Sequence, residues 1–164
     1  MNNMQVYPVK AFRDNYIWTI NNETHAVVVD PGDSKPVIDF LRSKKLTLIA
    51  ILITHTHPDH IGGIKNLLDQ YDIPVYGPET EAIPGISHKL VEGDLVRLDQ
   101  LSLTFKVLDI PGHTAGHIAY FDHQRLFCGD TLFSCGCGRI FEGSPPQMFR
   151  SIEKLTNLPD LTEV

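Results

Sequence analysis

The chain carries at residues 54–60 the stretch Thr-His-Thr-His-Pro-Asp-His, which places three histidines and one aspartate within six positions. This stretch ends an almost continuous apolar run, residues 47–54, that predicts a strand buried on both faces. Side chains on a loop directly after a rigid strand can converge on one point beyond the sheet edge. In a continuous strand, His60 would instead face away from the other three. The stretch therefore predicts a metal site rather than a solvated surface loop.

Two further polar clusters also follow apolar strands. The first is Pro-Gly-His-Thr-Ala-Gly-His at residues 111–117, and the second is Gly-Asp-Thr at residues 129–131. Histidine nitrogens and carboxylate oxygens suit zinc, iron or manganese, and one carboxylate can bridge two cations. Two metals close together would lower the pKa of a shared water and polarise the carbonyl group that it attacks. The three clusters therefore predict a dinuclear hydrolytic centre.

The order of the expected elements predicts an α/β fold with two packed sheets and helices outside them. Ser34 is expected to cap a first helix, and a second helix is expected over residues 63–71. The last helix, residues 145–155, would place Met148, Phe149, Ile152 and Leu155 on one apolar face. Strands are expected at residues 5–9, 16–21, 25–30, 47–54, near 75, and at 89–91, 95–98, 101–108, 117–121 and 125–128, the last two as a hairpin.

Composition limits the classes of protein and partner that remain open. With 164 residues, 42% of them hydrophobic and 21% charged, the chain is expected to form one domain over residues 1–164. No apolar run reaches the roughly 20 residues that a membrane helix needs, so we expect a cytoplasmic protein without a membrane partner. A net charge of −6 without a Lys/Arg cluster argues against nucleic acid. The expected partner is a small molecule, and the expected state is a monomer.

The three cysteines do not indicate a disulfide framework or a thiolate metal site. They number an odd three, at Cys128, Cys135 and Cys137, in a chain without a signal peptide. A structural zinc on the Cys-x-Cys pair would need two further ligands at suitable spacing, and none lies nearby. We therefore expect reduced thiols outside the metal chemistry.

Taken together, the three polar clusters resemble the metallo-β-lactamase superfamily. The matching patterns are T-H-x-H-x-D-H, P-G-H-T-x-G-H and G-D-T-L-F. Within the superfamily, the segments Cys-Gly-Cys-Gly-Arg-Ile-Phe-Glu-Gly at residues 135–143 and Asp-Asn-Tyr-Ile-Trp at residues 14–18 resemble glyoxalase II, or hydroxyacylglutathione hydrolase. This resemblance spans essentially the whole chain and implies an αββα sandwich fold.

The resemblance also implies a set of metal ligands. It assigns one metal to His55, His57 and His113, the second metal to Asp59 and His60, and a bridging position between both metals to Asp130. The implied cofactors are two divalent ions, with zinc as the first choice and iron or manganese as alternatives. Asp59 and Asp130 are then the catalytic residues, acting with a metal-bound hydroxide.

Four other residues receive roles from the same resemblance. Asp30, in an Asp-Pro-Gly turn, matches a supporting acid rather than a ligand, and His117 matches a structural hydrogen-bonding residue. Arg139 and Phe141 lie in the segment that contacts glutathione in the family, so both are predicted to bind substrate. Phe141 replaces a tyrosine of some relatives, and a contact through that hydroxyl would be absent here.

The implied reaction is the hydrolysis of a glutathione thioester, S-D-lactoylglutathione, to D-lactate and glutathione by a metal-bridging hydroxide. The leaving group is a thiolate, and a thiol with a pKa near about 8.5 departs with little help from a general acid. The chain is accordingly predicted to be a thiolester hydrolase that takes part in methylglyoxal detoxification.

The chain also departs from the family pattern. Glyoxalase II has a seventh metal ligand, a histidine in a Gly/Ala-His-Glu-Tyr-Thr segment, and a C-terminal helical domain, and this sequence includes neither before it ends at Val164. A catalytically impaired metal-binding fragment is therefore an alternative hypothesis. A related persulfide dioxygenase with one iron shares the His-x-His-x-Asp-His cluster and is another. A β-lactamase is disfavoured because many of those enzymes have cysteine where this chain has Asp130.

Overall fold

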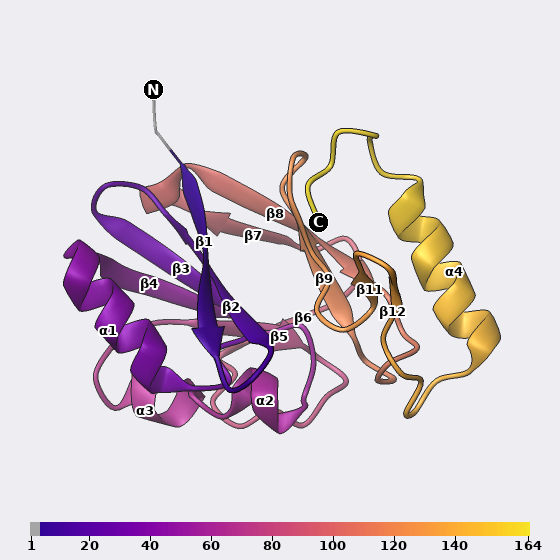
Figure 1. Ribbon diagram of the computed structural model, residues 1–164, viewed down its shortest axis with the longest axis horizontal. Coiled ribbons are helices and arrows are strands. Elements are labelled where there is room, and N and C mark those ends of the chain that lie inside the picture. Colours follow the sequence, from indigo (N-terminus) through magenta and orange to yellow (C-terminus); the bar gives the residue numbers. More distant parts are fainter. Residues whose placement is uncertain (1–3) are drawn as a thin grey trace.

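The computed structural model describes residues 4–164, which form two packed sheets with helices on either side (Figure 1). One sheet has six strands in the order β1-β2-β3-β4-β5-β6: β1 (Gln5–Ala11), β2 (Asn15–Asn21), β3 (His25–Val29), β4 (Thr47–Leu52), β5 (Val75–Pro78) and β6 (His88–Leu90). The other has four strands in the order β10-β9-β8-β7: β7 (Leu95–Leu98), β8 (Leu103–Asp109), β9 (Ile118–Phe121) and β10 (Leu126–Phe127). The predicted two-sheet α/β architecture is confirmed.

The helices cover the outer faces of the sandwich. They are α1 (Ser34–Lys44), α2 (Pro58–Ile61), α3 (Ile64–Leu68) and α4 (Pro145–Thr156), with a 3-10 turn at Asp99–Leu101. Helices α1 and α3 lie on the side of the six-stranded sheet, and α4 lies at the opposite end of the molecule (Figure 1). Val37, Leu41 and Leu67 from α1 and α3 pack against Ala26 and Ile51 of the sheet. Burial of these side chains is the main stabilising contribution of the helices.

A bulge in the central strand β4 decides which face of the sheet each of its apolar side chains occupies. The register with β3 pairs Ala26 with Leu48 but Val27 with Ala50, so Ile49 is an extra residue. Leu48 consequently faces the helices, whereas Ala50 packs in the core between the two sheets. A regular strand would have put both side chains on the same face.

Tyr120 of β9 ties the two sheets together at the end of β4. Its side chain is completely buried, and its hydroxyl donates a hydrogen bond to the carbonyl of Ile53 at 2.8 Å. The carbonyl of Tyr76 lies 3.3 Å from the same hydroxyl. This contact therefore fixes the point at which the chain leaves β4 and enters the His-rich stretch.

Several predicted boundaries are wrong, each for a local reason. The side chain of Asp33, not that of Ser34, accepts the hydrogen bond that caps α1. Asp59 and His60 lie in the four-residue helix α2 rather than in an irregular loop. The next helix is only Ile64–Leu68, so it ends three residues before the predicted boundary.

Helix α4 has a narrower buried face than its sequence predicted. Phe149 is 66% exposed, whereas Met148, Ser151 and Leu155 are buried. Residues 148, 151 and 155 share one face because they are three and four positions apart, and residue 149 is rotated away from them. Ser151 donates a hydrogen bond to the carbonyl of Pro111 at 2.7 Å, which ties α4 to the loop that carries His113.

A small two-stranded sheet was not predicted from the sequence. It pairs β11 (Leu132–Phe133) with β12 (Gly136–Cys137), so the segment between Asp130 and Arg139 forms a hairpin. The three cysteines are free thiols. Across residues 4–164, no helix combines the length and the apolar character that crossing a membrane requires.

Replacement of Tyr120 tests the link between the two sheets. We expect Tyr120→Phe to lower the free energy of unfolding by about 1–3 kcal/mol, because the buried carbonyl of Ile53 loses its donor. Urea denaturation followed by circular dichroism measures the change. Tyr7→Phe is the matched control, because its hydroxyl bonds to Gln5 at an exposed position and should contribute less than about 0.5 kcal/mol. Equal unfolding curves for Tyr120→Phe and the unaltered chain would contradict the link.

Candidate metal centre

The polar clusters meet at the edge of the sandwich where β4 ends. His55 and His57 follow β4, and Asp59 and His60 lie in α2. His113 follows β8, in a loop whose last residue, His117, directly precedes β9. The N–H of Ile118 donates to the carbonyl of Thr54 at 3.0 Å, so the start of β9 is bonded to the end of β4. Segments far apart in the sequence are thereby held within contact distance.

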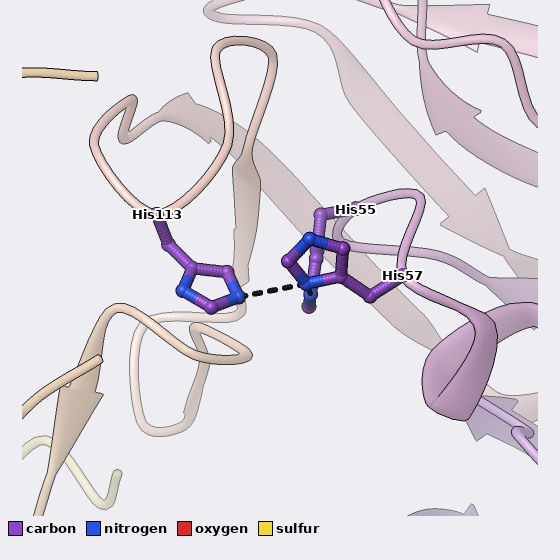
Figure 2. A group of neighbouring side chains, drawn as sticks. All are labelled: His55, His57 and His113. Atoms are coloured by element: carbon purple, nitrogen blue, oxygen red, sulfur yellow. Dashed lines mark hydrogen bonds between the residues drawn. The ribbon is translucent and has the colours of Figure 1, made fainter. Parts of the chain in front are cut away.

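Three histidine rings converge on one point (Figure 2). Nδ1 of His57 lies 3.2 Å from Nε2 of His55 and 2.9 Å from Nε2 of His113. The rings meet edge to face, with interplanar angles of 82° and 85° between His57 and the other two. Three imidazole nitrogens in this arrangement form a donor set for a borderline-soft divalent metal.

The outer nitrogens of two of these rings have partners that fix their tautomers. Nδ1 of His113 donates to the carbonyl of Arg139 at 2.7 Å. Nδ1 of His55 lies 2.9 Å from the hydroxyl oxygen of Thr54. Because that hydroxyl donates its own hydrogen to Asp30 at 2.6 Å, its oxygen accepts the hydrogen of Nδ1. Both contacts leave the Nε2 lone pair directed at the point of convergence, as in metal-ligating histidines.

A second group of donors surrounds Nε2 of His60. It lies 3.3 Å from an oxygen of Asp130 and 3.5 Å from an oxygen of Asp59. The other oxygen of Asp130 lies 3.5 Å from Nε2 of His113, so the two oxygens of this carboxylate face different histidines. Among residues 4–164, Nε2 of His60 is buried without a hydrogen bond of regular geometry. An orphaned nitrogen between two carboxylates fits a position for a cation.

Asp30 supports both groups of donors without being free to join them. Its carboxylate accepts from the N–H of Thr54 at 2.8 Å and from its hydroxyl, and lies 3.0 Å from Nδ1 of His60. These contacts occupy both oxygens, which agrees with a supporting acid even though Asp30, His55 and His60 are close enough to share an ion. Asp30 has a φ of 53°, a left-handed conformation that aspartate tolerates better than most residues.

Burial and charge shift the pKa values of these groups in opposite directions. Burial lowers the pKa of His55 and His113, and neighbouring imidazoles lower it further, so both rings are neutral and able to bind a metal. Burial opposes the charged form of His60, but Asp30 and Asp130 outweigh it and raise its pKa to about 10. Burial would also raise the pKa of Asp130, yet the nearby imidazole of His60 outweighs burial and lowers it. His60 thus occupies a strongly negative position.

Known proteins share this architecture and sequence. The model of the metallo-beta-lactamase superfamily matches residues 12–162. The chain belongs to the metallo-β-lactamase superfamily. The crystal structure of ETHE1 from Myxococcus xanthus superposes with a TM-score of 0.82 at 32% identity, covering 97% of this chain and 72% of that one. The crystal structure of TTHA1623 in a di-iron-bound form superposes with a TM-score of 0.77 at 32% identity, covering 96% and 89%.

Within the superfamily, the chain is similar in sequence to curated hydroxyacylglutathione hydrolases. Hydroxyacylglutathione hydrolase from Nitrosomonas europaea is 59% identical over 161 residues, which are 98% of this chain and 62% of that protein. The chain thus spans less than two thirds of the length of the curated relatives that it matches. The resemblance to glyoxalase II inferred from the motifs is confirmed. The superfamily and the donor set together indicate a divalent-metal site.

The two predicted substrate residues lie beside the metal centre but differ in their contacts. Phe141 is 60% exposed, and its ring packs edge to face against His57 and His113 with centroids 5.3 and 5.2 Å apart. Arg139 contacts His113 through its carbonyl. Its guanidinium is exposed and, within the described part of the chain, makes no hydrogen bond or ion pair. The main chain and the side chain of Arg139 therefore have separable roles.

Sequence reasoning missed three residues that shape the site. Thr54 joins Asp30 to His55, as described above. Asn15 donates its side-chain amide to Asp59 at 2.8 Å across 44 positions of sequence. Gly138 is buried against Asp130, where an added Cβ would lie 1.8 Å from the carbonyl oxygen. Asn15 and Gly138 both belong to the motifs quoted for glyoxalase II, but their function depends on contacts that only the folded chain makes.

Substitution of Gly138 tests whether the placement of Asp130 controls metal binding. We expect Gly138→Ala to weaken binding of zinc about 10–100-fold, because the added Cβ forces the main chain of Asp130 to move. Competition with a chromophoric chelator measures the dissociation constant. Gly136→Ala is the matched control, since nothing lies within 4 Å of its added Cβ. If both variants bind zinc equally well, the tight packing at Gly138 is irrelevant to the site.

Proposed function

We propose that this chain carries the metal centre of a glutathione thioester hydrolase, which converts S-D-lactoylglutathione to D-lactate and glutathione. The observation that carries the proposal is the convergence of His55, His57 and His113 beside His60 and Asp130, in a chain 59% identical to a hydroxyacylglutathione hydrolase. That identity favours the hydrolase over a persulfide dioxygenase or a β-lactamase.

The ligands are proposed to hold two cations. His55, His57 and His113 would hold the first, Asp59 and His60 would hold the second, and Asp130 would contact both. The two oxygens of Asp130 face His60 and His113 separately, which is the arrangement that a bridging carboxylate needs. A related structure that holds two irons supports a dinuclear site. Zinc is the proposed metal because histidine and carboxylate donors suit it, and iron and manganese are the alternatives.

Divalent cations bound here would supply Lewis acidity and a bound water of lowered pKa. The chain's own residues fix the geometry in which that chemistry can act. The hydrogen bonds of His55 and His113 hold their rings in one tautomer, and Asn15 holds Asp59 from outside. The ring of Phe141 packs edge to face against both His57 and His113. Because the leaving group is a thiolate, no side chain is required as a strong general acid.

Metal content and turnover measured together test this function. We expect about two zinc ions per chain by elemental analysis and release of D-lactate from S-D-lactoylglutathione. Asp130→Ala should retain at most one ion and lose at least about 100-fold in kcat, because the bridging position is gone. If the unaltered chain binds metal but releases no D-lactate, it is a metal-binding fragment rather than a hydrolase. If it binds no metal under any loading condition, the metal-centre proposal fails as well.

Arg139→Ala tests whether the side chain of Arg139 contributes to substrate binding without contributing to metal binding. The carbonyl that accepts from His113 is unchanged by this substitution, so zinc content should stay the same. The proposed contact of the guanidinium with glutathione would be lost, and KM should rise on the order of tenfold with little change in kcat. Steady-state kinetics measure both constants. A fall in zinc content, or an unchanged KM, would contradict the substrate role of the side chain.

A further inference from the structure

A carboxylate outside the predicted ligand set lies at the same sheet edge as the metal centre. Strands β3, β4 and β5 are parallel neighbours, so the residues that follow them meet at one edge. Asp30 follows β3 and His55 follows β4, and the corresponding segment after β5 carries Glu81. Neither the three sequence motifs nor the metal chemistry above makes use of Glu81.

Glu81 binds the loop that carries His113. Its Oε1 accepts from the hydroxyl of Thr114 and from the N–H of Gly116 at 3.1 Å. Thr114 directly follows His113 and is completely buried. Gly116 is packed so closely that an added Cβ would lie 2.6 Å from Cγ of Glu81. The carboxylate therefore holds this loop at two points and at close range.

The same segment also binds the loop that carries His55 and His57. Thr56 lies between these two histidines, and its hydroxyl donates to the carbonyl of Ala82 at 3.4 Å. This hydrogen bond is long, and the buried Oε2 of Glu81 forms no hydrogen bond of regular geometry within residues 4–164. Glu81 and Ala82 thus contact both histidine-bearing loops.

The environment of Glu81 is costly for a carboxylate. The side chain is half-buried, and burial raises its pKa, with a further contribution from Glu142 nearby. No lysine, arginine or histidine forms an ion pair with it in the part of the chain that the structure describes. Loop hydrogen bonds are therefore what offset the cost of burying the charge.

We propose that Glu81 is a positioning residue, which sets the spacing between the His55/His57 loop and the His113 loop and so pre-organises the three imidazoles for a cation. The inference rests on the proposed metal centre, and it adds to that centre a residue that coordinates nothing. The first loop is held weakly through Thr56 and the second firmly through Thr114 and Gly116. Loss of the carboxylate should release the His113 side of the triad.

Three variants of the full chain test the proposal through zinc affinity. Glu81→Ala should raise the dissociation constant about 10–100-fold, as loss of outer-shell support does at other metal sites. Glu81→Gln should restore most of the affinity, because its amide oxygen can accept from Thr114 and Gly116. Glu79→Ala is the matched control, since Glu79 is an exposed carboxylate two positions earlier. The zinc affinity of this variant should equal that of the unaltered chain. Chelator competition gives all three constants.

The visible absorption spectrum of the cobalt-substituted chain distinguishes positioning from general stability. We expect Glu81→Ala to change the position and intensity of the cobalt bands, because the geometry of the triad changes, while Glu79→Ala leaves them as they are. If Glu81→Ala does not fold, Thr114→Val removes one donor to Glu81 and should raise the zinc dissociation constant in the same direction by a smaller factor.

The outcomes separate this proposal from the proposed function. Unchanged zinc affinity and unchanged cobalt bands in folded Glu81→Ala, or in Thr114→Val if Glu81→Ala does not fold, would overturn the positioning role alone. Zinc binding without turnover in the unaltered chain would overturn the hydrolase and leave the affinity comparison valid. Combining Glu81→Ala with Thr114→Val should add little to Glu81→Ala, because both remove the same contact. Additive effects would mean that the two residues act independently.

Discussion

The buried carboxylate of Asp30 is the interaction on which the metal centre depends. It accepts from the main chain and hydroxyl of Thr54 and contacts His60, so it joins the end of β3 to the end of β4 and to helix α2. A buried carboxylate without such partners would be strongly unfavourable, so the network forms as a unit or not at all. His55 receives its orientation through the same threonine.

The sandwich supplies a rigid base for these contacts. Parallel strands β3, β4 and β5 bring three loops to one edge, and the hydrogen bonds of Ile118 and Tyr120 align the second sheet with that edge. Ligands from both sheets therefore converge without a long ordered loop. A donor set built on strand ends is positioned more accurately than one built on flexible segments, because close packing fixes the strands.

The two groups of donors in the centre have different electrostatic environments. Burial keeps His55 and His113 neutral, whereas the carboxylates around His60 favour positive charge at that point. Asp130 lies between these two environments, with one oxygen toward each. Asn15 and the carbonyl of Arg139 hydrogen-bond to Asp59 and His113, and Glu81 hydrogen-bonds to the loop that follows His113.

The sequence alone determined which residues could form the site, because ligand types at short spacing are readable locally, as in residues 54–60. Apolar runs between turn residues likewise predicted most strands, and the order of strands and helices predicted the α/β class. Only the tertiary structure decided that a bulge at Ile49 reverses the faces of β4 and that α2 carries Asp59. It also decided that the oxygens of Asp130 point to different histidines and that Glu81 lies between two loops. These features depend on contacts between distant residues, which no local pattern encodes.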